Sequence, residues 1–161
     1  MLFRSVVIGT TDTNPLVAGS GIARLRQAGT EVVTGVMEKE CRWLNRRFFT
    51  WHEKKRPYVI LKWARSADGF IDLVRKPGDA AEPNWITGMA ERVLVHRWRA
   101  AEDAILAGGG TIRADNPALN VRFWNGKNPA RILVTRSGNI NPQSAVFDGE
   151  TQTIIYTCNN N

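Results

Sequence analysis

Apolar positions along the chain fall into short runs that are separated by polar turns. Residues 6–10 (Val-Val-Ile-Gly-Thr) are typical of a buried strand, residues 19–28 of a helix that ends before Gly29, and residues 31–36 of a second strand. A strand, a helix and a strand within about 30 residues predict a βαβ unit. We therefore expect these two strands to be parallel, because such a crossover joins parallel strands.

The next stretch, residues 38–51, contains no proline and one helical apolar stripe, so it predicts a single continuous helix. The polar residues 52–57 follow it and end in proline, which is typical of a linker. We therefore expect two domains, with residues 1–55 in the first and 56–161 in the second. The stripe consists of Cys41, Leu44, Phe48 and Trp51.

The second domain shows strand-like runs that alternate with helical patterns. A helix is expected over 87–101 with Thr87 as its N-cap, and residues 74–84 contain the proline and glycine of a loop. The alternation predicts an α/β fold with a mostly parallel sheet. The expected strands are residues 58–64, 104–107, 131–135 and 153–156.

Composition narrows the class of protein. The 161 residues are 43% hydrophobic, which is enough for a core, and the net charge is +7, with a basic stretch over residues 42–56. Such a stretch can bind nucleic acid or acidic lipid, but no stacking motif accompanies it, so a solvated helix face and a linker is the favoured interpretation. We expect neither a nucleic-acid nor a membrane partner.

The two cysteines, Cys41 and Cys158, lie in no metal-binding or disulfide spacing. No secretory signal and no apolar run of membrane-spanning length is evident. We therefore expect a cytoplasmic protein with free thiols. A zinc deaminase needs an H-x-E segment and a P-C-x-x-C segment, and the two histidines here fit neither, so no metal site is expected in these residues.

Several positions suggest anion chemistry. Residues 108–111 (Gly-Gly-Gly-Thr) join a strand to a helical turn, where backbone amides can approach a phosphate, although a tight turn explains the glycines equally well. Arg92, His96 and Arg99 share one helix face. Arg122 follows a strand-like run, and two arginines of this set that reach one cleft would suit a phosphorylated substrate. The alternative is that they are ordinary surface arginines. His96 is interpreted as a structural histidine.

Two further residues are unusual where they stand. Lys62 lies within an apolar run, which predicts that it faces a cleft or a partner, with the loop carboxylates of Asp68 and Asp115 as candidates. Trp85 follows a proline-containing loop and either stacks on a ligand ring or belongs to the core.

Several motifs in order resemble the bifunctional riboflavin-biosynthesis deaminase/reductases, and the resemblance covers nearly the entire chain. The most specific is the stretch 110–122 (Gly-Thr-Ile-Arg-Ala-Asp-Asn-Pro-Ala-Leu-Asn-Val-Arg). The other reductase-like motifs are residues 56–64, 66–69, 85–87, 95–100, 103–106 and 128–134, and the deaminase-like ones are residues 12–22 and 44–49.

The resemblance implies two activities. The deaminase removes an amino group from a phosphoribosylamino-pyrimidine, and the reductase uses NADPH to reduce the ribosyl side chain to a ribityl one. It further implies that residues 1–55 are the end of a cytidine-deaminase-like domain and that residues 56–161 begin a dihydrofolate-reductase-like domain. A phosphorylated pyrimidine substrate and a homo-oligomeric complete protein are implied as well.

The resemblance also assigns roles residue by residue. It implies that Lys62 lies near the reacting carbon, and Pro83 stands where the family often has a serine that contacts substrate. The implied substrate contacts are Arg99, Leu119 and Arg122. The implied cofactor contacts are Ala64, Trp85, Thr111, Asp115 and Arg136.

Two parts of the family pattern are not found in these residues, namely the zinc-binding half of the deaminase and the second glycine-rich cofactor segment. We therefore expect a chain truncated at both ends, with zinc only in the missing deaminase part and little turnover by the chain alone. The alternative is a non-catalytic remnant or binding fragment.

Overall fold

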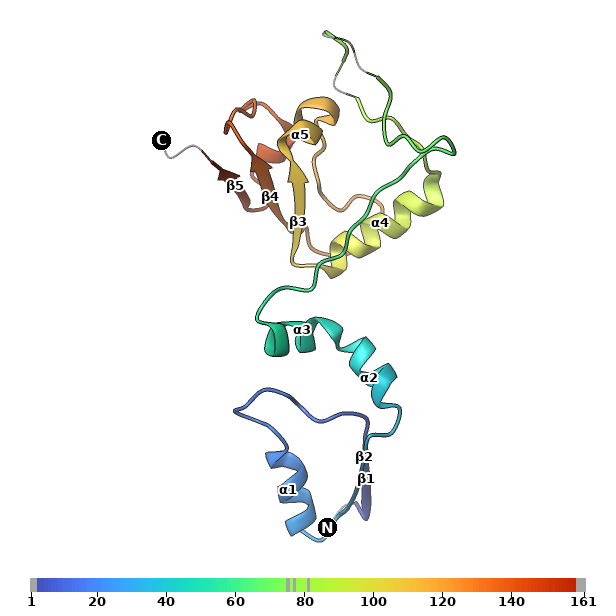
Figure 1. Ribbon diagram of the computed structural model, residues 1–161, viewed down its shortest axis with the longest axis vertical. Coiled ribbons are helices and arrows are strands. Elements are labelled where there is room, and N and C mark those ends of the chain that lie inside the picture. Colours follow the sequence, from blue (N-terminus) through green and yellow to red (C-terminus); the bar gives the residue numbers. More distant parts are fainter. Residues whose placement is uncertain (1–2, 75, 77, 81, 159–161) are drawn as a thin grey trace. The chain divides into compact units, whose positions relative to one another are not determined.

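A computed structural model describes residues 3–74, 76, 78–80 and 82–158 of the chain. It divides into two compact units, residues 1–62 and 63–161 (Figure 1). The first unit contains β1 (Ser5–Ile8), α1 (Ser20–Gln27), β2 (Glu31–Thr34), α2 (Glu38–Leu44) and α3 (Arg46–Lys54). The second contains α4 (Met89–Ala101), β3 (Ala104–Gly108), α5 (Gly109–Asp115), β4 (Ala130–Thr135), the 3-10 helix η1 (Ala145–Phe147) and β5 (Thr153–Thr157).

The first unit confirms the expected βαβ arrangement. Strands β1 and β2 are parallel, with Val6 opposite Val32, and α1 connects them. Gly29 follows the helix with a φ of 77°, a left-handed conformation that glycine adopts without strain.

The single helix expected over residues 38–51 is wrong. The chain forms two helices, and Asn45 lies between them. The break shifts the phase of the helical repeat, so the expected stripe does not face a core. Leu44 and Trp51 are 75% and 57% exposed, whereas Phe49 and Thr50 are buried instead.

The segment between the units differs from the expected linker. His52 to Lys54 belong to α3, which ends before Lys55. The two compact units meet in sequence after Lys62, later than the expected start of the second domain at residue 56. The assignment of residues 1–55 and 56–161 to two families of domain stays a prediction.

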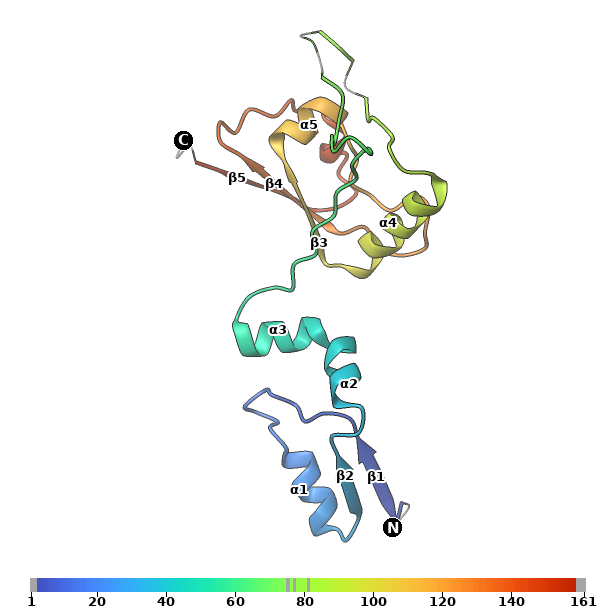
Figure 2. The same cartoon turned by 45° about the vertical axis from the view of Figure 1, so that its right-hand side comes forward.

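Three parallel strands form the sheet of the second unit, in the order β3-β4-β5 (Figure 2). These strands and α5 confirm the elements predicted from residue 104 onward. Helix α4 is also confirmed, but it begins at Met89, and its N-cap is Gly88 rather than Thr87.

The strand expected over residues 58–64 is not formed. The residues of this segment form neither helix nor strand and pair with no strand of either sheet. Its apolar side chains consequently face solvent: Val59 is 61%, Leu61 77% and Trp63 67% exposed. Apolar composition favours a strand, but backbone hydrogen bonds to a neighbour are what form one.

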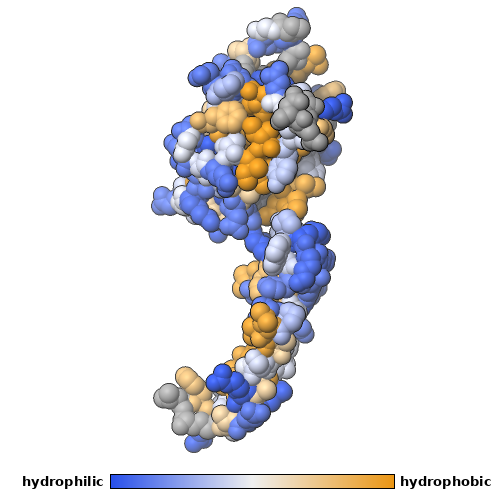
Figure 3. Space-filling model, turned by 90° about the vertical axis from the view of Figure 1, so that its left-hand side faces the viewer, coloured by the Kyte–Doolittle hydropathy of each residue, from blue (hydrophilic) through white to orange (hydrophobic). Residues whose placement is uncertain are grey.

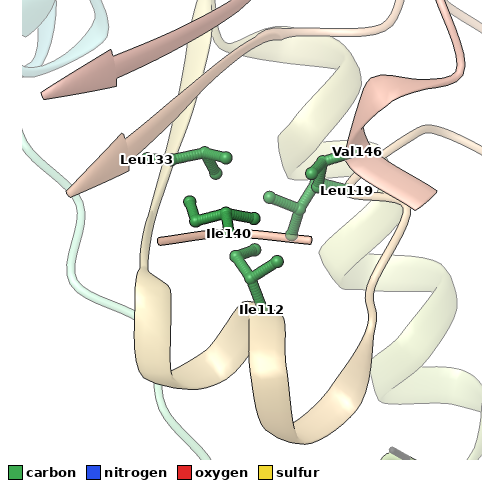
Figure 4. Close-up of a cluster of buried hydrophobic side chains, with 5 residues drawn as sticks. All are labelled: Ile112, Leu119, Leu133, Ile140 and Val146. Atoms are coloured by element: carbon green, nitrogen blue, oxygen red, sulfur yellow. The ribbon is translucent and has the colours of Figure 1, made fainter. Parts of the chain in front are cut away.

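The core of the second unit lies on one face of its sheet, and the side chains of five residues point toward one another there (Figure 4). The opposite face is open, because side chains of all three strands are exposed on it: Leu106 by 66%, Val134 by 46% and Tyr156 by 59%. Figure 3 shows apolar side chains at the surface of this unit. The core residues are Ile112, Leu119, Leu133, Ile140 and Val146.

A buried arginine ties β4 to the segment that follows η1. The Arg131 side chain is fully buried, and its Nη1 and Nη2 donate hydrogen bonds of 2.6 and 2.8 Å to the two carboxylate oxygens of Asp148. Nη1 also donates to the Val146 carbonyl at 2.8 Å. Removing a charged group from water costs free energy unless the charge is paired, and the bidentate contact with Asp148 offsets this cost for Arg131.

No helix within the described part of the chain is long and apolar enough to span a bilayer.

Candidate functional site

Helix α4 presents a cationic face around a buried histidine. His96 is 4% exposed, and burial followed by the positive charges of Arg99, Arg122 and Arg92 lowers its pKa to about 4. The expectation that Arg92, His96 and Arg99 share one side of the helix fits this common influence. His96 is therefore neutral near pH 7, in the midst of three cations.

Asn120 holds two of these arginines. Nη1 of Arg99 donates to the Asn120 backbone carbonyl at 3.0 Å, and Nη1 of Arg122 donates to Asn120 Oδ1 at 2.9 Å. Burial, and then the neighbouring charge of Arg122, lowers the pKa of Arg99. The Nε of Arg99 is buried without a hydrogen-bond partner in the described residues. One asparagine thus brings two guanidinium groups together, which favours an anionic ligand.

The backbone of Arg122 is held from α4. Its N–H donates to His96 Nδ1 at 2.9 Å, and the ring of Phe123 packs edge-on against the imidazole with centroids 4.8 Å apart. The preceding residue, Val121, donates its N–H to Asn128 Oδ1 at 2.8 Å. The Arg122 side chain itself is exposed.

Aromatic rings extend the cationic face. The guanidinium of Arg92 lies 3.8 Å from the ring centroid of Trp85 and 5.1 Å from that of Phe123. Trp85 is 55% exposed, so part of its ring is open to a ligand rather than in the core. An open hollow of about 390 Å³ lies beside these groups, lined by Arg122, Phe123, Trp124 and Asn125.

A second group of predicted residues lies at the carboxyl ends of two neighbouring parallel strands. Thr111 is exposed in the first turn of α5, directly after β3, and Arg136 is exposed directly after β4. Gly109 lies so close to β4 that a Cβ on it would come within 3.0 Å of the Thr135 side chain. Ligands of open parallel sheets bind at such strand ends.

The remaining predicted residues are placed as follows. Asp115 is the half-buried last residue of α5, Pro83 is exposed, and Ala64 is half-buried. Lys62 is exposed and is the last residue of the first unit, whereas Arg99 and Arg122 belong to the second, so its implied place near the reacting carbon stays a prediction.

Leu119 belongs to the hydrophobic core. Its side chain is 6% exposed and packs with Ile112 and Leu133, and its φ is 52°. A substrate contact at this position would therefore come from its backbone.

Within the part of the chain that the structure describes, no group of three or more His, Cys, Asp or Glu side chains is placed to hold a metal ion. The expectation that the chain carries no zinc stays a prediction.

Sequence reasoning did not identify Asn120 or Phe123 as parts of the site. Both act through contacts with α4, which lies more than 20 residues earlier in the chain. The signal available from the sequence was their position near Arg122: Asn120 lies within the specific motif at 110–122, and Phe123 follows it directly.

Comparison with known proteins gives one family. The model of the RibD C-terminal domain matches residues 57–161. The riboflavin biosynthesis protein RibD of Actinobacillus pleuropneumoniae is 47% identical over 130 residues, which are 81% of this chain and 33% of that protein. RibD of Synechocystis is 39% identical over 153 residues, covering 94% of this chain and 40% of the relative. The chain thus spans about two fifths or less of the length of these relatives.

Solved structures give the same family as the sequence comparisons. A diaminohydroxyphosphoribosylaminopyrimidine deaminase/5-amino-6-(5-phosphoribosylamino)uracil reductase from Thermotoga maritima matches 98% of this chain and 43% of its own, with a TM-score of 0.86 and 40% identity. RibD of Acinetobacter baumannii matches 96% of this chain and 44% of its own, with a TM-score of 0.78 and 35% identity.

Proposed function

The chain belongs to the RibD family of riboflavin-biosynthesis proteins, and on this premise we propose that it supplies part of an NADPH-dependent reductase site. The substrate is 5-amino-6-(5-phosphoribosylamino)uracil, and the product carries a ribitylamino side chain. Residues 56–161 belong to a dihydrofolate-reductase-like domain, and residues 1–55 are the end of the deaminase domain of a bifunctional enzyme.

The observation that carries this proposal is the pairing of Arg99 and Arg122 through Asn120. Two guanidinium groups, one on α4 and one on the segment between α5 and β4, offer several N–H donors to one anion. Their planar forks match the oxygens of a phosphate better than a lysine would. A phosphoribosyl substrate carries such a group at one end, so these residues fix that end and leave the sugar carbon to be reduced.

NADPH supplies the hydride when it is bound. The residues that we assign to it suit its chemistry: an exposed hydroxyl at Thr111 and an exposed cation at Arg136 for phosphate groups, and the half-open ring of Trp85 for stacking. The close approach of Gly109 to Thr135 brings the start of α5 against β4 without a side chain between them. Ala64 and Asp115 complete the proposed cofactor contacts.

Lys62 is proposed to act on the opened sugar. Its ammonium group orients the substrate oxygen and stabilises the negative charge that develops there as hydride reaches the carbon. A contact that strengthens in the transition state raises turnover more than substrate affinity.

Steady-state kinetics on the protein expressed from its complete gene test these roles. Arg99→Ala and Arg122→Ala should each raise KM for the substrate about 10- to 100-fold, because each removes a charge-assisted hydrogen bond worth about 1.5–3 kcal/mol. Lys62→Ala should mainly lower kcat. The matched control is Arg24→Ala, an exposed arginine of α1 that is outside the proposed site.

Oxidation of NADPH is the readout, with NADH as the competing cofactor. A protein that reduces the substrate with NADH alone would contradict the cofactor assignment. Unchanged KM in both arginine variants would contradict the phosphate assignment.

A further inference from the structure

His96 is a buried titratable group that the proposed function does not use. It lies on the side of α4 that faces the segment after Asn120, and only 4% of it is exposed. Residue 122 belongs to a stretch without helix or strand between α5 and β4, so no regular hydrogen-bond ladder orders its backbone.

The contact between them has a defined direction. The backbone N–H of Arg122 donates to His96 Nδ1 at 2.9 Å. A backbone N–H is only a donor, so Nδ1 carries no proton and the neutral imidazole is protonated at Nε2. This hydrogen bond joins residues that are 26 positions apart, and it anchors the segment between α5 and β4 to the 13-residue helix α4.

We propose that His96 is a positioning residue, which fixes the backbone of Arg122 so that the Arg122 guanidinium is held ready for the substrate phosphate. The proposal rests on the phosphate role of Arg122 in the proposed function. With its main chain tied to His96 and its Nη1 tied to Asn120 Oδ1, Arg122 is restrained at both ends of its side chain. Less conformational freedom is then lost when the phosphate binds.

The surroundings of His96 favour this role over proton transfer. Its Nδ1 is already occupied by a main-chain donor, and the ring is shielded by Phe123. Burial and the three arginines hold its pKa at about 4, so the accepting, neutral form is present near pH 7.

Two conservative variants separate this role from simple packing. Asn places its amide oxygen near the position of Nδ1, whereas Gln reaches toward the position of Nε2 and is closer to histidine in volume. If His96 positions Arg122, His96→Asn should retain most of the affinity for phosphate, and His96→Gln should lose about tenfold, since the partly buried N–H of Arg122 is left unpaired. If His96 only fills space, Gln should be the better replacement.

The full 161-residue chain is titrated calorimetrically with ribose 5-phosphate, and the Arg122 amide is followed by hydrogen exchange. Circular dichroism confirms folding of each variant. We expect the amide to be protected in the unmodified chain and in His96→Asn, and to exchange faster in His96→Gln.

A double-mutant cycle with Arg122→Ala decides the matter. The tenfold effect of His96→Gln should shrink to less than about twofold when Arg122 is absent, because the histidine then has no guanidinium to place. An equal loss in both backgrounds, no loss at all, or an unprotected Arg122 amide overturns the inference. If Arg122→Ala alone binds ribose 5-phosphate as tightly as the unmodified chain, the proposed phosphate site fails, and this inference fails with it.

Discussion

At the scale of single residues, two buried polar side chains organise the second unit in different ways. Arg131 forms a bidentate ion pair with Asp148, and its hydrogen bonds are the first cause that lowers the pKa of Asp148. His96 instead gives up its charge, because burial and neighbouring arginines disfavour the protonated ring. The second unit therefore contains a buried side chain that takes part in an ion pair, Arg131, and a buried side chain that is held neutral, His96.

The neutral His96 predicts a pH-dependent stability. Its pKa is lowered from 6.5 to about 4 in the folded chain, so the unfolded chain takes up a proton first. The stability linked to this group is fully present above pH 6.5 and is lost as the pH falls toward 4. The groups that disfavour protonation are Arg92 and Arg99 on α4 and Arg122 on the facing segment.

Chemical denaturation of the chain at a series of pH values checks this expectation. Between pH 6.5 and 4 the free energy of unfolding of His96→Asn, which cannot titrate, should fall less steeply than that of the unmodified chain. Identical slopes for the two proteins would show that His96 is not held neutral by the fold.

At the scale of elements, the junction of β3 and α5 shows why neighbouring glycines differ in role. A Cβ on Gly109 would meet the Thr135 side chain of β4 at 3.0 Å, whereas a Cβ on Gly110 has nothing within 4 Å. Only the first glycine is required by packing. The glycine run is thus explained in part by the close approach of α5 to the sheet.

This contrast provides a matched pair of variants. Gly109→Ala should destabilise the chain by about 1–3 kcal/mol, because overpacking forces β4 or α5 to shift. Gly110→Ala should be neutral or stabilise by up to about 1 kcal/mol, since alanine favours a helix more than glycine does. Urea denaturation measures both, and equal effects of the two substitutions would refute the packing argument.

At the scale of the whole molecule, the boundary between the two units lies within residues 55–65, which form neither helix nor strand. Residues 55–65 contain Lys55, Lys62 and Arg65, all exposed, whereas Arg131 inside the second unit is fully buried. Proteases cut where backbone is exposed and unpaired.

Brief digestion with trypsin should therefore cut within residues 55–65 well before it cuts at Arg131. Mass spectrometry of the first products identifies the bonds. Early cleavage at Arg131 with an intact 55–65 segment would mean that the second unit opens before the segment does. A denatured sample, in which both sites should be cut, is the control.

The elements whose pattern is local could be predicted from the amino-acid sequence. The βαβ unit, α4, the strands from residue 104 onward and their parallel pairing follow from apolar periodicity and turn residues, which act over a few positions. The motif at 110–122 likewise indicated the family. The arginine face of α4 was also visible, because residues at i, i+4 and i+7 share a side of any helix.

Features that depend on contacts between distant residues are visible only in the folded chain. Residues 58–64 have strand-like composition but no paired neighbour, and Asn45 divides a stretch whose pattern is that of one helix. Arg99 meets Asn120, and His96 meets Arg122, through hydrogen bonds between residues that are 21 and 26 positions apart. Hydrogen-bond pairing and burial are properties of the packed chain, so no local pattern contains them.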